Sequence, residues 1–350
     1  MSREKGIQTV YGGGGHVVIL GAGASIASTR RNPERNGKVL PSMDNFIDVV
    51  GLAEIVKRLP AELQAKNFET LYSNLHQHDP NCEAIQEIEW IVQEYFRDMR
   101  LPDEPTIYDY LVLSLRPKDL IATFNWDPFL FQAFQRNRHV ADMPLLSFLH
   151  GNVAMGFCEK DRTTGLAGYT HKKTLNYYEP TRLLYPVTQK NYNQDEFTKI
   201  EWGRLRYWLE SDVTKRITIF GYGAPASDVE AVKLLNDAWG TPDDRNMEQV
   251  EIIDIRPQDE VRDQWDNFIH SHHYDYTNDY FGSVLAHYPR RTSESWFHHY
   301  LPATVEEAFM ESNPVPKDFK TLQEMWDWFK PLIDAENEWK AKQPKEGTEQ

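Results

Sequence analysis

The chain has 350 residues, and its 53 acidic against 38 basic side chains give a formal net charge of −15. An acidic surface repels phosphate backbones and anionic lipids, so neither nucleic acid nor a membrane is expected as the main partner. The two cysteines, Cys82 and Cys158, are far apart, which excludes a disulfide framework and a four-cysteine zinc site and fits a reducing compartment. Without a signal peptide or an apolar run of about 18 residues, the chain is expected to be a soluble cytoplasmic protein.

The first strand and the first functional turn are predicted in the segment 16–25. The apolar, β-branched run Val17–Leu20 predicts a short strand buried on both faces. A turn of small residues follows, made of Gly21, Ala22, Gly23, Ala24 and Ser25. Such a turn lets phosphate groups approach the N–H groups at the start of the next helix, although a purely structural turn has the same composition. Ile26 stands where the common dinucleotide fingerprint has a third glycine.

A helical region is predicted between the first and second strands. Residues 27–38 are polar and basic and predict an ordered loop or lid. Ser42 or Asp44 is expected to cap a helix that begins directly after them. Over 46–100 apolar residues recur at helical spacing, which predicts two to four helices without a strand. One more helix is predicted over 106–115, and we therefore expect a helical insertion into a sheet domain.

Strands and helices alternate through the rest of the chain. Further strands are predicted over 119–125, 145–151, 182–187, 216–221 and 250–255. Helices are predicted from residue 127 onwards and over 195–209, 227–238 and 258–269. The segment 153–181 is rich in Gly, Thr, Lys and Tyr and is expected to be mostly loop. This alternation predicts an α/β fold with a mostly parallel sheet, right-handed crossovers and helices on both faces.

Polar and small residues fall at the ends of the predicted strands. The ends are marked by Gly21, Asn125, His150, Gly221 and Asp254. Ligands of open parallel sheets bind at the carboxyl ends of the strands, outside the sheet itself. The coincidence therefore predicts a nucleotide site at this edge of the sheet.

Asn125 and Asp127 lie at the predicted transition from a strand to a helix. The Asn125 amide can donate and accept in one plane, which suits it to hold a water molecule or a ribose hydroxyl in a fixed direction. Asp127 lies near a helix N-terminus, which stabilises its charge. Both residues could instead be helix caps.

His150 ends an apolar strand and precedes a glycine. Histidine titrates near neutral pH, so His150 could take a proton from a sugar hydroxyl or from water. The alternative is a core histidine whose ring nitrogens are satisfied by the protein.

A second turn of small residues begins at Gly221 and Tyr222 and precedes another predicted helix. This turn suits a phosphate or a ribose, or else Ser227 or Asp228 simply caps the helix. Asp254, at a strand end, could accept hydrogen bonds from ribose hydroxyls or could form a turn.

The histidine clusters at 270–273 and 298–299 lack the helical spacing of metal ligands and have no cysteine beside them, so no metal is expected. The tail, 291–350, contains several prolines and a tryptophan-rich segment. Its tryptophans are expected to pack or to form an interface rather than to bind a ligand.

Together these motifs resemble a sirtuin-like domain, a Rossmann-like fold. The resemblance covers about residues 16–270 and is carried, in the family's order, by Gly21–Ser25, Leu40–Ser42, Thr123–Asp127, His150-Gly151, Gly221-Tyr222 and Asp254. It is greatest to the divergent bacterial antiphage-defence branch, whose members hydrolyse NAD instead of deacylating proteins. The chain departs from the family in lacking the four-cysteine zinc module of the deacylases, in its helical insertion, and in a longer turn after Tyr222.

The resemblance implies a sirtuin-like, Rossmann-type NAD-binding domain over 1–290, with the helical insertion at about 45–116, and a helical, Trp-rich extension over 291–350. It implies that the turn from Gly21 to Ser25 holds the pyrophosphate of NAD. Asn125 and His150 would act at the nicotinamide ribose. The remaining cofactor-binding residues would be Asp127, Gly221, Tyr222 and Asp254.

The function implied is an NAD⁺ hydrolase that releases nicotinamide and ADP-ribose without a metal. Asn125 would orient the attacking water or the ribose 2′-hydroxyl, and His150 would be the general base. Because depletion of NAD would kill the host, activity is expected to be gated by assembly, as a homo-oligomer or with a partner protein of a defence system. Two alternatives stay open, namely an NAD-dependent protein deacylase and a regulatory module that binds NAD or ADP-ribose without turnover.

Overall fold

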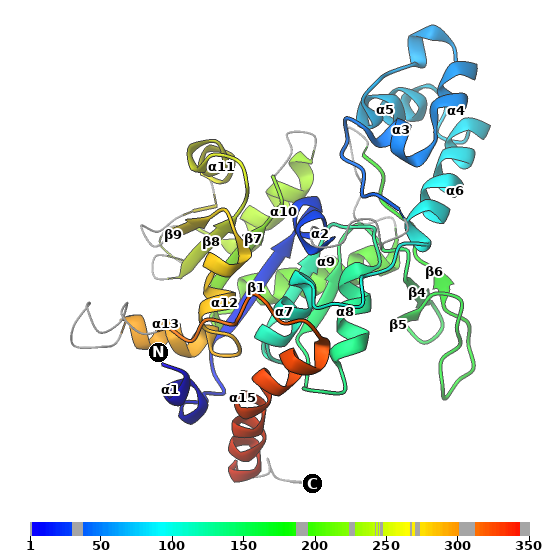
Figure 1. Ribbon diagram of the computed structural model, residues 1–350. Helices are drawn as coiled ribbons and strands as arrows, with labels where there is room; N and C mark the ends of the chain where they lie inside the picture. Colours follow the sequence, from blue (N-terminus) through cyan, green and yellow to red (C-terminus); the bar gives the residue numbers. More distant parts are fainter. Residues whose placement is uncertain are drawn as a thin grey trace.

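A computed structural model of the chain describes residues 2–29, 38–186, 195–223, 228–241, 243, 245, 248–266, 268, 269, 274–300 and 312–343. At its centre lies a six-stranded sheet with helices on both faces, so the predicted α/β fold class is confirmed (Figure 1). The strands of this sheet are β1 (Gly15–Leu20), β2 (Leu120–Thr123), β3 (Leu145–Phe148), β7 (Thr214–Phe220), β8 (Gln249–Ile253) and β9 (Tyr274–Thr277).

All neighbouring strands of the sheet are parallel, in the order β3-β2-β1-β7-β8-β9. The chain therefore moves outward from β1 to β3 and then returns to the other side of β1 with β7. In a doubly wound sheet of this order, the two adjacent strands whose crossovers run in opposite directions leave a crevice at their carboxyl ends. That crevice lies between β1 and β7.

β1 is buried on both faces, as its apolar sequence predicts. Val18 and Leu20 belong to the hydrophobic cluster on one face of the sheet, and Val17 and Ile19 to the cluster on the other. Because side chains alternate along a strand, a continuous β-branched run serves both clusters at once.

Helices cover the two faces of the sheet. The Val17 face packs against α9 (Glu196–Glu210), α10 (Val229–Trp239) and α11 (Gln258–Trp265). The Val18 face packs against α7 (Ile107–Ser114), α8 (Phe129–Asn137), α12 (Val284–His287) and α15 (Leu322–Lys342). The other helices of this body are α1 (Arg3–Gln8), α2 (Ala22–Thr29), α13 (Thr292–Tyr300) and the 3₁₀ turn η3 (Tyr280–Gly282).

The helices predicted between the first two strands are present and form a lobe that extends away from the sheet (Figure 1). They are α3 (Phe46–Val50), α4 (Ala53–Arg58), the 3₁₀ turn η2 (Ala61–Leu63), α5 (Phe68–His78) and α6 (Glu83–Arg97). The predicted caps Ser42 and Asp44 are wrong. Asn45 occupies the N-cap without a side-chain cap bond, because its Oδ1 instead accepts from the N–H of Ser42 at 2.7 Å.

The predicted loop or lid over 27–38 is wrong at its start, because α2 continues to Thr29. The rest of that prediction, 30–37, lies outside the described residues, as do Ser227 and residues 270–273. The strand predicted over 182–187 is absent from 182–186. There the chain runs beside His150, whose carbonyl accepts from the N–H of Leu184 at 2.9 Å.

The segment 153–181 is mostly loop, as predicted, but the prediction missed the short strands within it. The segment contains a small antiparallel sheet of β4 (Met155–Cys158), β5 (Thr163–Leu166) and β6 (Glu179–Pro180), in the order β5-β4-β6. A Cβ on Gly165 would lie 2.4 Å from the Tyr178 ring, so the glycine makes room for that ring across the sheet. The Gly- and Tyr-rich composition that indicated a loop reflects this packing.

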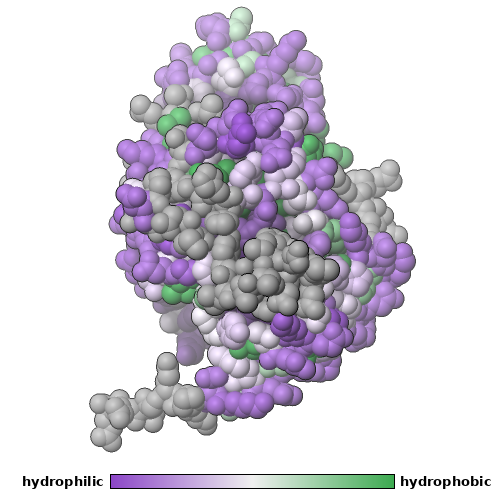
Figure 2. Space-filling model, turned by 90° about the vertical axis from the view of Figure 1, so that its left-hand side faces the viewer, coloured by the Kyte–Doolittle hydropathy of each residue, from purple (hydrophilic) through white to green (hydrophobic). Residues whose placement is uncertain are grey.

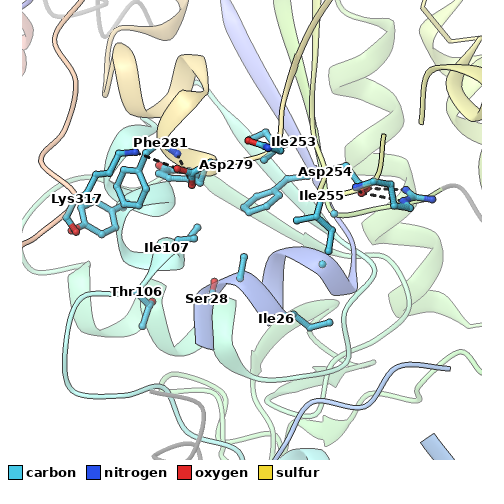
Figure 3. A pocket seen from close by; sticks show the side chains of 18 of the residues that line it. Ile26, Ser28, Thr106, Ile107, Ile253, Asp254, Ile255, Asp279, Phe281 and Lys317 are labelled. Carbon is cyan, nitrogen blue, oxygen red and sulfur yellow. Dashed lines mark hydrogen bonds and ion pairs between the residues drawn. The ribbon is translucent and has the colours of Figure 1, made fainter. Parts of the chain in front are cut away.

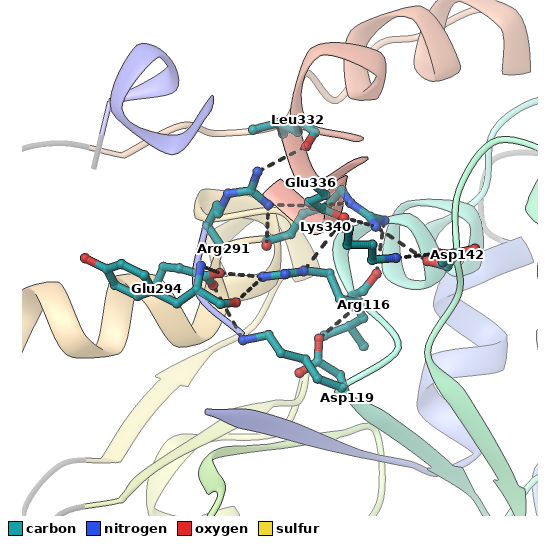
Figure 4. Close-up of polar contacts among 12 residues, drawn as sticks. Arg116, Asp119, Asp142, Arg291, Glu294, Leu332, Glu336 and Lys340 are labelled. Carbon is teal, nitrogen blue, oxygen red and sulfur yellow. Dashed lines mark hydrogen bonds and ion pairs between the residues drawn. The ribbon is translucent and has the colours of Figure 1, made fainter. Parts of the chain in front are cut away.

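The C-terminal helix α15 belongs to the main core, to which it contributes Met325, Phe329 and Ile333. A buried cluster of charges, the Arg–Glu cluster, fixes it there (Figure 4). The cluster consists of Arg116, Arg290, Arg291, Glu294 and Glu336. It lies at the amino ends of β1 and β2, where Ser293 donates to the carbonyl of Gly14 at 2.9 Å, on the opposite edge from the strand ends considered below.

On the face shown in Figure 2, the described surface is mostly hydrophilic, with apolar residues scattered among the polar ones. Within the described ranges, no helix has both the length and the apolar composition that crossing a bilayer requires.

Candidate functional site

Two cavities open at the carboxyl ends of the strands. The first, of about 400 Å³, is here called the His150 cavity. Of the predicted site residues it is lined by Gly21, Ala22, Ser25, Asn125, Asp127, His150, Gly221 and Tyr222. The second, of about 720 Å³, is called the Asp254 cavity and also takes in Gly23 (Figure 3). Ala24 lines neither cavity and is buried in the core.

The two cavities adjoin each other along the second turn of small residues. Both are lined by Ile26, Gly221, Gly223 and Arg256. An elongated ligand could therefore pass over Gly221 from one cavity into the other. This continuity lies at the crevice between β1 and β7 that the strand order defines.

The turns after β1 and β7 touch backbone to backbone. A Cβ on Gly21 would lie 2.5 Å from the carbonyl oxygen of Gly221, and one on Gly221 would lie 2.4 Å from the nitrogen of Ala24. Gly221 also has a φ of 59°, in the left-handed region that favours glycine. The three glycines of these turns, Gly21, Gly23 and Gly221, thus have a structural reason that is independent of any ligand.

Several N–H groups of the first turn already have main-chain acceptors. Gly21 donates to Phe220, Gly23 to Gly221, and Ala24 to Gly21, each at 3.0 Å. The use of the whole turn as a phosphate site stays a prediction. A phosphate there would have to use the other groups of the turn or displace the Gly221 carbonyl.

Asn125 is held by its amide nitrogen, and 9 % of its surface is exposed. Nδ2 donates to the carbonyl of Gly21 at 2.8 Å, to Ser25 Oγ at 2.9 Å and to Tyr108 Oη at 3.2 Å. Because the amide is planar, fixing Nδ2 also fixes the direction of Oδ1. The helix-cap alternative does not apply to Asn125, since α8 begins four residues later, at Phe129, and Pro128 occupies its N-cap.

Asp127 is linked to Asn125 through Ser25. The Ser25 hydroxyl donates to Asp127 Oδ2 at 2.7 Å, and the N–H of Phe129 donates to Oδ1 at 3.1 Å. Burial raises the pKa of Asp127 to about 6, against the lowering effect of these two donors. Burial and the nearby Asp127 charge also raise the pKa of Tyr108, so its hydroxyl stays a donor in this network.

His150 faces a carboxylate that had been considered only as a cap. Its Nε2 lies 3.4 Å from Asp228 Oδ2. Asp228 is at the N-cap of α10 but makes no side-chain cap bond, so the capping alternative for it is wrong. The Tyr222 hydroxyl donates to the same carboxylate at 3.5 Å. A carboxylate in this position orients an imidazole and stabilises its protonated form.

Aromatic rings set the position of the His150 imidazole. Phe124 meets the imidazole edge-on at 4.8 Å between centroids and stacks on Tyr222 at 4.1 Å. Only 7 % of the surface of His150 is exposed, so the residue can contact a ligand in the cavity but is shielded from bulk water. Its carbonyl, rather than its ring, bonds to the neighbouring chain at Leu184.

Asp254 lies in the Asp254 cavity and is tied to Arg256. The guanidinium donates to both carboxylate oxygens, at 3.0 and 2.8 Å, and the N–H of Arg256 donates to Oδ1 at 2.9 Å. The last of these bonds closes a turn, so the turn-forming alternative for Asp254 is confirmed. A role with ribose hydroxyls stays a prediction, because carboxylate oxygens can accept further bonds. Arg256, which sequence reasoning did not consider, lines both cavities.

The two cavities differ in the character of their walls. Isoleucines line much of the Asp254 cavity, and the ion pair of Lys317 with Asp279, at 3.2 Å, lies at its edge (Figure 3). Phe46 and Phe96 of the helical insertion, together with Trp126, line one side of the His150 cavity. The Asp254 cavity suits a flat base. The His150 cavity surrounds a polar centre with apolar groups that limit the access of water.

No group of three or more His, Cys, Asp or Glu residues that could hold a metal is found in the described part of the chain. The histidine cluster 270–273 and the side chains of His298 and His299 lie outside it.

No protein-family model matches the sequence, and no curated protein matches it either. Among solved structures, the chain is similar to a Sir2 homologue in complex with NAD, with 15% sequence identity over 84% of this chain and 94% of that one and a TM-score of 0.40. It is similar to a mutant Sir2 homologue with ADP-ribose, with 10% identity over 99% of this chain and 100% of that one and a TM-score of 0.38. A further mutant, with 2′-O-acetyl ADP-ribose, has 13% identity over 89% and 98% and a TM-score of 0.39.

Proposed function

We propose that the chain is an NAD⁺ hydrolase that cleaves the bond between nicotinamide and ribose. The observation that supports this most is that Asn125, Asp127 and His150 line one cavity, which continues over Gly221 into the Asp254 cavity. A dinucleotide has the matching form, with two ribosyl groups joined by a flexible pyrophosphate. Its adenosine half would occupy the Asp254 cavity, and its nicotinamide riboside half the His150 cavity.

In the proposed reaction, water attacks C1′ of the nicotinamide ribose. The bond from C1′ to the pyridinium nitrogen breaks, its electron pair neutralises that nitrogen, and the products are ADP-ribose, nicotinamide and one proton. His150 takes the proton from the attacking water, and Asp228 stabilises the imidazolium that forms. The Asn125 amide, fixed through Nδ2, orients the water or the ribose 2′-hydroxyl.

The direct test is an NAD-consumption assay with product analysis on the purified chain. Asn125→Ala and His150→Ala should each lower kcat by about 100-fold or more, since each removes a group that acts on the reacting atoms. His78→Ala, which changes a histidine at the end of α5 outside both cavities, is the matched control and should keep full activity. Full activity in either site variant would overturn the role given to that residue.

Product analysis also separates the two alternatives. An acyl-lysine peptide that is deacylated, with acylated ADP-ribose as co-product, would identify a deacylase. Binding of NAD with no consumption after long incubation would identify a regulatory module. ADP-ribose and nicotinamide formed without any peptide are the result that the proposal expects.

We also propose that the enzyme acts in antiphage defence and is restrained until it assembles with itself or with a partner protein. Unrestrained loss of NAD would kill the host, and the insertion is larger than a nucleotide site requires. The full chain should gain activity with concentration as light scattering detects oligomers. Activity that is maximal in a monomer would contradict this.

A further inference from the structure

A third cavity, here called the Arg100 cavity, lies apart from the two described above. It has a volume of about 850 Å³ and shares no lining residue with the His150 or Asp254 cavity. Its walls come from the C-terminal end of α6, from α8, and from the small sheet of β4, β5 and β6, which lie close together in Figure 1. Its size is in the range of small-molecule sites.

All charged residues that line the Arg100 cavity are arginines, namely Arg97, Arg100 and Arg136. This is unexpected in a chain with 53 acidic and 38 basic residues. The other two cavities are lined by carboxylates as well as by cations, Asp254 and Asp127 among them. The potential in the Arg100 cavity therefore favours an anion.

The three arginines differ in how far their charge is already compensated. Arg136 donates to Asp109 Oδ1 at 2.6 Å, and Arg97 pairs with Glu94 at 2.7 Å on the surface. Arg100 donates to the carbonyls of Arg97 and Met99, each at 2.8 Å. Among the described residues, no carboxylate forms an ion pair with its guanidinium within 4.0 Å, although Asp98, which pairs with Lys38, interacts with it at longer range.

Aromatic rings line the same cavity as these cations. Tyr169 and Tyr177, on the chain that follows β5, are 64 % and 47 % exposed, and Phe131 of α8 lines the inner wall. Exposed tyrosines next to arginines form a surface on which a flat ring can stack while an attached anion meets the guanidinium groups. The amides of Gln93 and Gln135 add neutral hydrogen-bonding groups to the same walls.

We infer that the Arg100 cavity binds a nucleotide at a site separate from the proposed NAD⁺ site. Arg100, supported by Arg97, holds the phosphate through charge-assisted hydrogen bonds. Tyr169 and Tyr177 stack on the base. The absence of lining carboxylates among the described residues disfavours cationic ligands, and the aromatic rings disfavour a bare inorganic anion as the preferred occupant.

The inference is tested by photolabelling the full chain with 8-azido-ADP and mapping the labelled peptides by mass spectrometry. Label is expected in the segments 93–101 or 166–177, and AMP should compete for it, whereas adenosine and pyrophosphate alone should compete poorly. Because the position of the label is read directly, this result is independent of whether the chain hydrolyses NAD. Label confined to peptides of the His150 and Asp254 cavities would overturn the inference.

Two pairs of variants make the test specific. Arg100→Glu should reduce labelling of these segments by about tenfold or more, because it replaces a cation of the cavity wall by an anion. Arg206→Glu, the same change on exposed α9, should leave it within about twofold. Tyr169→Ala should reduce it by about fivefold or more, and Tyr207→Ala, 72 % exposed on α9, should not. Undiminished labelling in Arg100→Glu would contradict the assignment.

Discussion

Asp228 has a different role in the folded chain from the one that its position in the sequence indicates. In sequence it follows a turn of small residues and precedes a helix, the usual position of a cap. In the structure its carboxylate faces His150 at 3.4 Å and makes no cap bond. Under the proposed function Asp228 is a positioning residue, because it acts through His150 and not on the substrate.

Asp228→Asn should therefore lower kcat for NAD by about 10- to 100-fold while leaving KM within about threefold. The amide keeps the size of the carboxylate but no longer stabilises a protonated imidazole. Steady-state kinetics on the purified variant measures this. Asp263→Asn, with a side chain that is 71% exposed on α11, is the matched control. A change in KM alone would show that Asp228 has another role.

At the residue scale, sequence reasoning found the residues at strand ends but not their partners. Asn125 and His150 could be selected because apolar runs stop immediately before them. Tyr108 and Arg256 could not, since the first belongs to α7 and the second sits in a charged loop. Both reach the site only because the sheet brings distant segments together.

At the scale of elements, the two turns at the strand ends are packed so closely that they form one unit. Gly21 and Gly23 meet Gly221 backbone to backbone, with two hydrogen bonds between the turns. A shift of either turn must therefore move the floor of both cavities.

Gly221→Ala should destabilise the fold by about 1–3 kcal/mol, because the new Cβ would clash with Ala24 and the left-handed φ is unfavourable for alanine. Chemical denaturation measures the free energy of unfolding. Gly203→Ala is the control, since Gly203 lies on α9 with open space around it. That change should instead stabilise the protein by about 0.5–1 kcal/mol, the difference in helix propensity. Equal effects of the two variants would contradict the close packing of the turns.

Among the elements, the buried parallel strands were predicted well, because a continuous β-branched run such as Val17–Leu20 is typical of a strand buried on both faces. The small sheet was missed, since β6 has only two residues and β4 contains a glycine. The run 182–187 looked like a strand, yet residues 182–186 pack beside His150 without joining the sheet. A short apolar run predicts that a segment is buried more reliably than it predicts that the segment pairs with a neighbouring strand.

At the scale of the whole molecule, the Arg–Glu cluster joins segments from distant parts of the sequence. Glu336 of α15 accepts from Arg290 Nη2 and from Arg291 Nη1, both at 2.6 Å, and Arg116 pairs with Glu294 at 2.5 Å (Figure 4). Burial alone would raise the pKa of Glu336, but the charges and hydrogen bonds of Arg290 and Arg291 outweigh it and bring that pKa to about 2.

Since the folded-state pKa of Glu336 lies below its ordinary value of 4.5, ionised Glu336 stabilises the fold above pH 4.5. That contribution is lost as the pH falls from 4.5 towards 2. Glu336→Gln should cost about 3–5 kcal/mol at neutral pH, because the buried Arg290 and Arg291 then lose the carboxylate that pairs with both of them. Its stability should also fall less steeply in acid.

Chemical denaturation as a function of pH measures both effects. Glu338→Gln, which changes an exposed glutamate of the same helix, should leave the curve unchanged. A Glu336→Gln variant as stable as the wild type at neutral pH would show that the cluster contributes no net stability.

The position of α15 limits where the chain can be truncated. A chain that ends before Met325 would lose the apolar side chains that α15 adds to the main core, and it would leave Arg290 and Arg291 without their partner Glu336. Such a fragment is therefore expected to be less stable than the full chain. Affinity handles and fused reporters are better placed after Gln343, where α15 has ended.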